Sequence, residues 1–209
     1  MHSGPRCHSC THLPGCLFSA LTKTELRFLP LTILQMPKNA IIYQQGFPAD
    51  AVFFLRDGTV KLLGLSAMGT QRIVGILKSG EMFGLDSLLP GRTRVFTAVT
   101  RDRSQLCFIE RGLFIRALRS APDLLWKFST VLNLAMHEAQ QEKLTTAGSS
   151  VHNRLEIALN ECGKRNLRLK QIELAELIGA TPETVNRELH RGRISFPDPE
   201  RLALSRPNG

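Results

Sequence analysis

The chain has 209 residues, a formal net charge of +9 and 43% hydrophobic residues, which is enough to bury a core. No apolar run reaches the roughly 18 residues of a membrane span, and the N-terminus lacks the apolar stretch of a secretory signal. These properties argue against membrane and secreted classes and predict a cytoplasmic protein. In that reducing compartment, metal ligation is favoured over disulfides for the five cysteines. The positive charge permits nucleic acid as a partner without establishing it.

Residues 1–20 form a cysteine-rich segment. Cys7, Cys10 and Cys16 follow the spacing C-x2-C-x5-C, and Cys107 lies far downstream. Four thiolates are what a tetrahedral zinc ion or a [4Fe–4S] cluster requires, and thiolate softness suits both. We expect one loop to supply three ligands and a packed domain to supply Cys107. The site would then tie the N-terminal segment to that domain.

Two other readings of this segment are weaker. The histidines among the cysteines are favoured as solvated loop residues over ligands; they are His2, His8 and His12. A C-x2-C pair also occurs in thiol oxidoreductases, but there it opens a helix after a strand of a βαβ unit, and no such unit surrounds it here.

Residues 21–110 predict a β-roll domain. Thr22 and Glu25 have the spacing of a capping box, which predicts a short helix at the start of this domain. Short apolar runs separated by glycine-containing turns follow, as in a β-barrel or roll. We expect the strands at 41–43, 52–55, 60–63, 73–77 and 96–100.

Residues 111–147 predict a dimerisation helix. Apolar side chains recur at alternating steps of three and four, which is the pattern of a coiled-coil seam. A helix packed on its own domain would give the same pattern, but the polar content favours a helix that projects and pairs with a second copy. The expected seam residues are Leu125, Phe128, Leu132, Ala135 and Ala139.

Residues 148–209 predict a helix-turn-helix domain. Gly179 ends the first helix, Thr181 is a good N-cap and Pro182 suits the first position of the second helix. Val185 and Leu189 are expected to face inward. The opposite face carries polar side chains suited to reading base edges, namely Glu183, Asn186 and Arg187. The expected phosphate contacts are Lys170 and Thr181.

Taken together, these features resemble the CRP/FNR family of bacterial transcription regulators, and within it the FNR-type iron–sulfur oxygen sensors. The resemblance implies an α+β fold: a cyclic-nucleotide-binding-type β-roll, a long dimerisation helix and a C-terminal winged helix-turn-helix. It implies a [4Fe–4S] cluster at the four cysteines whose destruction by oxygen or nitric oxide weakens dimerisation and DNA binding. The implied protein is an activator of genes for anaerobic metabolism and not an enzyme. A DNA-binding regulator with a structural zinc or a thiol redox switch at the same cysteines is the alternative.

The resemblance also implies partners and base contacts. The partners are a second copy, palindromic double-stranded DNA with FNR-like half-sites, and RNA polymerase. Arg187 and Glu183 match the arginine and glutamate that read the inner G·C pair of a half-site, while Asn186 replaces the usual serine.

Two further departures from the family pattern bear on function. Leu85 stands where nucleotide-binding relatives have a ribose-binding glutamate, and their phosphate-binding Arg-Ser pair is here Arg94-Val95, so no cyclic nucleotide is expected. Past Arg191 the sequence continues directly into what resembles the second wing strand. The end of the recognition helix and the first wing strand are therefore expected to be missing.

Overall fold

The computed structural model describes residues 7, 10–65, 69–91, 93–146 and 148–191. The chain divides into two compact units, which are considered separately. The first consists of 1–64 and 74–136, and the second of 65–73 and 137–209. In the described part of the chain, no helix is long and apolar enough to cross a membrane.

The first unit begins with short helices within and after the cysteine loop. The predicted capping box is confirmed: Thr22 Oγ1 accepts from the Glu25 amide at 3.3 Å, and Glu25 Oε2 accepts from the Thr22 amide at 2.7 Å. This pairing satisfies two amides that would otherwise lack partners at a helix start. The elements are the 3-10 helices η2 (Leu13–Gly15) and η3 (Leu17–Ala20), then α1 (Lys23–Phe28).

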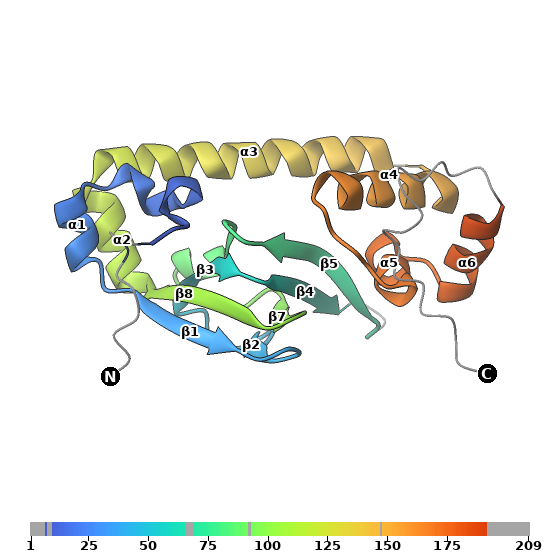
Figure 1. The fold of residues 1–209 in the computed structure, drawn as a ribbon, viewed down its shortest axis with the longest axis horizontal. Coiled ribbons are helices and arrows are strands. Elements are labelled where there is room, and N and C mark those ends of the chain that lie inside the picture. Colours follow the sequence, from blue (N-terminus) through green and yellow to red (C-terminus); the bar gives the residue numbers. More distant parts are fainter. Residues whose placement is uncertain (1–6, 8–9, 66–68, 92, 147, 192–209) are drawn as a thin grey trace. The chain divides into compact units, whose positions relative to one another are not determined.

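The predicted β-roll is confirmed as two antiparallel four-stranded sheets (Figure 1). One has the strand order β1-β8-β3-β6 and the other β2-β7-β4-β5. All five expected strands are present. The bounds are β1 (Thr32–Met36), β2 (Ile41–Tyr43), β3 (Ala51–Asp57), β4 (Thr59–Leu65), β5 (Gln71–Lys78), β6 (Met82–Phe83), β7 (Thr97–Thr100) and β8 (Ser104–Glu110). A 3-10 helix, η4 (Leu85–Leu88), follows β6.

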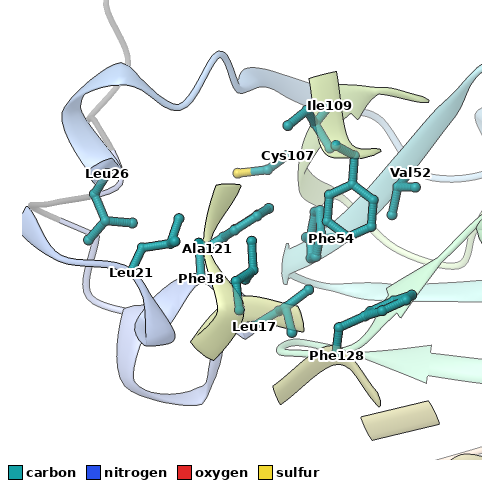
Figure 2. Close-up of a cluster of buried hydrophobic side chains, with 12 residues drawn as sticks. Leu17, Phe18, Leu21, Leu26, Val52, Phe54, Cys107, Ile109, Ala121 and Phe128 are labelled. Atoms are coloured by element: carbon teal, nitrogen blue, oxygen red, sulfur yellow. The ribbon is translucent and has the colours of Figure 1, made fainter. Parts of the chain in front are cut away.

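Strand β3 contributes to two apolar clusters, one on each face. Val52 and Phe54 belong to a cluster that includes Cys107 and the buried side chains of the N-terminal helices, and Figure 2 shows this cluster. Phe53 and Leu55 belong to the interior of the roll. Because successive side chains of a strand point to opposite faces, one strand connects the N-terminal segment to the interior of the roll.

The segment 111–147 contains two helices, α2 (Arg111–Ser120) and α3 (Pro122–Thr146). The break falls before Pro122, which cannot continue a helix from its interior but suits a first turn.

Phe128 was expected in the dimer seam, and that prediction is wrong for the described chain. Its side chain is only 6% exposed and packs edge-on against Phe114, with ring centroids 5.6 Å apart. It belongs to the core of its own protomer. The other expected seam residues are exposed; they are Leu125, Leu132, Ala135 and Ala139.

Met136 completes the exposed stripe instead of Phe128. Leu125, Leu132 and Met136 are 46%, 38% and 56% exposed. Their steps of seven and four keep them on one face of α3. This face is adjacent to the buried one.

The second unit contains α4 (Val151–Lys164), α5 (Gln171–Ile178) and α6 (Pro182–His190). Gly179 ends α5 with a φ of +67°, a conformation that favours glycine. Thr181 Oγ1 accepts from the Thr184 amide at 3.2 Å and so caps α6. The predicted helix-turn-helix is therefore present. The expected change in the wing lies in 192–209, outside the described residues.

Candidate metal centre and nucleic-acid interface

The cysteine loop is a succession of tight turns. The Cys10 amide donates to the Cys7 carbonyl at 3.1 Å, the Leu13 amide to the Cys10 carbonyl at 3.1 Å, and the Cys16 amide to the Leu13 carbonyl at 3.0 Å. Each bond reverses the chain within three residues. The loop therefore keeps three thiols close together although eight residues lie between the first and the last.

Cys107 comes from the packed domain, as expected. It lies in the middle of β8, paired with Ile33 of β1 and Phe54 of β3. It is buried, and its sulfur is turned toward the N-terminal segment (Figure 2). A thiol on a strand hydrogen-bonded on both sides is the fixed member of the set.

Electrostatic interactions link the four thiols. Burial, followed by the charges of Cys107, Cys16 and Cys10, raises the pKa of Cys7 to about 12. Burial raises the pKa of Cys107 to about 11, with contributions from Cys10 and Cys16. Burial also raises the pKa of Cys16, and Cys10 adds to it. Cys10, Cys16 and Cys107 thus each make ionisation of a neighbouring thiol harder, which requires that the thiols share one region.

The four thiols lie in one region but do not have the arrangement of a formed metal site. Among the residues that the structure describes, no group of three or more His, Cys, Asp or Glu side chains is arranged to hold a metal ion. The donors nevertheless fit a soft metal in kind and number, because all four are sulfur. Three of them lie on one short loop, and the fourth lies on β8.

Two cations border the thiols. Lys127 of α3 donates from Nζ to the Cys16 carbonyl at 2.9 Å and to Ser19 Oγ. Arg56 of β3 is 8% exposed, and its charge lowers the pKa of Cys107 and Cys7 against the effect of burial. Sequence reasoning missed both residues. The one available signal for Arg56 was an arginine directly after the apolar run of β3.

A different arrangement surrounds Arg94, in the region where relatives hold a nucleotide. Its Nη1 donates to the Gly84 carbonyl at 3.0 Å and to Asp86 Oδ1 at 2.8 Å, and its Nη2 donates to the Ala51 carbonyl at 2.9 Å. The guanidinium carbon lies 4.3 Å from the centroid of the Tyr43 ring. Arg94 is thus buried, with 2% of its surface exposed, and its charge is paired with the carboxylate of Asp86.

The turn at Gly84 packs closely against Arg94. Gly84 has a φ of +74°, and a Cβ added there would lie 2.8 Å from Arg94 Nη1. Leu85, which follows it, has an aliphatic side chain that cannot form hydrogen bonds with a ribose.

The predicted base-reading residues of α6 share an exposed face. All three side chains are accessible; they are Glu183, Asn186 and Arg187. Lys170 is also exposed. Thr181 is exposed, but its hydroxyl oxygen is already engaged as the cap of α6.

Helix α6 is anchored by an acid that sequence reasoning missed. Val185 is buried as expected, whereas Leu189 is only half-buried and Glu188 is buried beside it. Glu188 accepts from Arg191 at 2.8 Å and lies 3.3 Å from His152 Nδ1 of α4. This contact fixes the rotation of α6 and so determines which side chains it presents to solvent.

Comparisons with known proteins agree with this architecture. The family model for the cyclic nucleotide-binding domain matches residues 33–121. The cyclic AMP receptor protein of Thermus thermophilus is 29% identical over 181 residues, which is 83% of each chain.

Solved structures extend the comparison. The catabolite activator protein of Thermus thermophilus is 27% identical with a TM-score of 0.56, covering 84% of this chain and 85% of its own. The c-di-GMP-responsive regulator CLP of Xanthomonas campestris is 22% identical with a TM-score of 0.71, covering 80% of this chain and 89% of its own. The second likeness concerns the fold alone.

Proposed function

We propose, from the premise that this chain belongs to the CRP/FNR family of DNA-binding transcription regulators, that its DNA binding is gated by an oxygen-labile [4Fe–4S] cluster. Cys7, Cys10, Cys16 and Cys107 would hold the cluster. The observation that carries the proposal is the gathering of four thiols between a short loop and the central strand β8. When bound, such a cluster supplies a centre that oxygen or nitric oxide destroys.

The chain itself supplies a link from the cysteine loop to the long helix. Lys127 holds the carbonyl of Cys16 and the hydroxyl of Ser19, and it projects from α3 two residues after Leu125 of the exposed stripe. A movement of the loop would therefore act directly on the helix that carries the stripe. This contact supports coupling between the cysteines and assembly.

The exposed stripe of α3 is the proposed dimer surface. Leu125, Leu132 and Met136 would pack against the same residues of a second copy, since apolar side chains on one face of a helix gain from leaving water. A palindromic site requires two recognition helices about 34 Å apart. Losing the pairing of two α3 helices would therefore lose most of the specific affinity.

The exposed face of α6 would read bases in the major groove. The guanidinium of Arg187 can donate two hydrogen bonds to a guanine, and the carboxylate of Glu183 can accept a hydrogen bond from a cytosine amine. Asn186 would contact the outer bases, Lys170 would contact phosphate, and the Thr181 cap would set the entry of α6 into the groove. RNA polymerase is the further partner that such a regulator requires to activate transcription.

The test begins with composition. Protein purified without air should contain about four iron and four sulfide per chain, the stoichiometry of a cubane. On exposure to air the iron and sulfide should be lost, sedimentation should shift from dimer toward monomer, and DNA affinity at fixed salt should fall. One zinc and no sulfide would favour the alternative of a structural zinc. Unchanged assembly and affinity after cluster loss would exclude the gating.

A matched pair of variants tests the dimer surface. Leu132→Glu places a charge in the stripe and should give a monomer even without air. Leu134→Glu is the control, because Leu134 is 58% exposed and points away from the stripe. If both variants sediment as the wild type does, α3 does not form the interface.

A further inference from the structure

We propose that Arg56 is the positioning residue of the four-cysteine site, supplying the buried positive charge that offsets its thiolates. This inference rests on the proposed function, because it assumes that the four cysteines ionise to hold a metal centre. It concerns a residue outside the ligand set and on a different strand from Cys107.

Arg56 follows Phe54, the residue of β3 that is paired with Cys107, by two positions. Phe54 is paired with Cys107 and Leu55 with Leu106, but the next paired residue is Asp57, opposite Gln105. Arg56 is therefore the extra residue at a shift in register. Arg56 and Cys107 are therefore diagonal neighbours across the strand pair. The charge of Arg56 lowers the pKa of Cys107 against the effect of burial, as this position allows.

Arg56 is buried without an acidic partner. It is 8% exposed, and its Nε is buried with no hydrogen-bond partner. Within the described residues, the structure pairs no carboxylate with it. A buried guanidinium without a counter-ion is costly to a fold. The groups that its charge faces are Cys107 and Cys7. They become its counter-ions when they ionise.

Lys127 does not replace Arg56 in this role. Its ammonium bonds the carbonyl of Cys16 and the hydroxyl of Ser19, so it faces the loop from the side of α3. The two cations therefore border the site from different elements. Arg56 is the one beside Cys107, the ligand that the sheet holds in place.

The proposal predicts opposite effects on metal binding and on folding. Groups that orient and polarise metal ligands typically contribute 10–100-fold to metal affinity. Arg56→Met should weaken metal binding by about that factor. The same change removes a buried charge that lacks a partner, so the metal-free protein should be at least as stable as the wild type. Arg56→Lys keeps the charge without the planar fork and should bind with intermediate affinity.

The experiment titrates metal-free protein with Co²⁺ without air, following the thiolate-to-metal absorbance against a competing chelator. The control is Arg103→Met, which removes an exposed arginine near the start of β8. Urea unfolding of each metal-free variant gives the folding readout. If Arg56→Met binds Co²⁺ with the affinity of the wild type, the proposal is overturned. If the methionine variant does not fold, the same outcome in Arg56→Lys overturns it. The proposal is also overturned if Arg56→Met lowers both the affinity for Co²⁺ and the free energy of unfolding of the metal-free protein, because a purely structural role requires both losses.

Two outcomes separate this inference from the proposed function. A wild-type protein that binds Co²⁺ through four thiolates but assembles no iron and sulfide would refute cluster gating and leave the role of Arg56 standing. A wild-type protein with no thiolate–Co²⁺ absorbance would overturn the site, and the role of Arg56 with it.

Discussion

Two buried arginines of the β-roll differ in how their charge is met. Arg94 bonds two backbone carbonyls and the carboxylate of Asp86, and its guanidinium lies against the Tyr43 ring. Arg56 faces the thiols of Cys107 and Cys7, and among the described residues no carboxylate is paired with it. The Nε of both arginines is buried without a hydrogen-bond partner, so the difference is that Arg94 has a carboxylate as its counter-ion and Arg56 does not.

The difference bears on where a ligand would gain most from binding. A guanidinium already paired with a carboxylate has little to gain from a phosphate, whereas a buried guanidinium that faces Cys107 and Cys7 gains when these thiols ionise. Under the proposed function, the responsive site of the roll is the cysteine site and not the region of Arg94. Four experiments test this contrast.

The largest effect is expected from removing the fixed thiol. Cys107→Ser should reduce bound iron and sulfide to background, because an alcohol is a harder and far less acidic donor than a thiol. Cys162→Ser is the control, since Cys162 is buried in α4 of the second unit. Metal analysis after anaerobic purification measures both. Full metal content in Cys107→Ser would mean that the metal lies elsewhere.

Removing Arg94 should destabilise the protein strongly. Arg94→Met leaves Asp86 and two carbonyls without their donor, and loss of one partner of a buried pair costs about 3–5 kcal/mol. The free energy of unfolding in urea measures this loss. Arg103→Met should change it by only about 0.5 kcal/mol or less, as surface substitutions do. A loss no larger than the control's would show that Arg94 is not structural.

A smaller effect concerns pH. The folded metal-free protein holds the protons of Cys7 and Cys107 more tightly than the unfolded chain, because their pKa values rise from 9.0 to about 12 and about 11. The stability from this difference is complete below pH 9 and is lost as pH rises through those values. Urea unfolding of wild type and of a Cys7→Ser/Cys107→Ser variant across this range should show the steeper fall in the wild type. Parallel curves would contradict the raised pKa values.

The smallest effect is expected from cyclic AMP. A ligand at one hundred times its dissociation constant would stabilise the folded protein by about 2.7 kcal/mol. Because the charge of Arg94 is already paired with Asp86 and Leu85 cannot bind a ribose, the melting temperature should not change at millimolar cyclic AMP. A clear rise would show that Arg94 gives up its internal partners to a phosphate.

Local signals in the sequence predicted much of the fold. The capping box of Thr22 and Glu25, the stop at Gly179 and the cap at Thr181 depend on neighbouring residues, so their spacing is sufficient. The short strands were also recognisable, because glycine turns separate them. The spacing of Cys7, Cys10 and Cys16 was sufficient to predict that one loop carries them, and the distance to Cys107 along the chain was sufficient to predict that it comes from the packed domain.

Other features depend on contacts between distant elements. Phe128 and Met136 both fit a seven-residue repeat that includes Leu125, and only the packing of Phe114 decides that Phe128 is core. Arg56 required the register of β3 against β8, including its bulge. Glu188 required the position of His152 on another helix. No spacing rule along one segment contains this information.

The position of Cys107 in β8 also sets an order of events during synthesis. The three loop cysteines are synthesised first, and most of the β-roll is synthesised before Cys107, which lies in its last strand. At about 5–20 residues per second the delay is a matter of seconds. Even then Cys107 is held in place only once β8 lies between β1 and β3. The four thiols can therefore come together only after β8 has paired with both neighbouring strands. Metal binding by all four would then follow the folding of the roll.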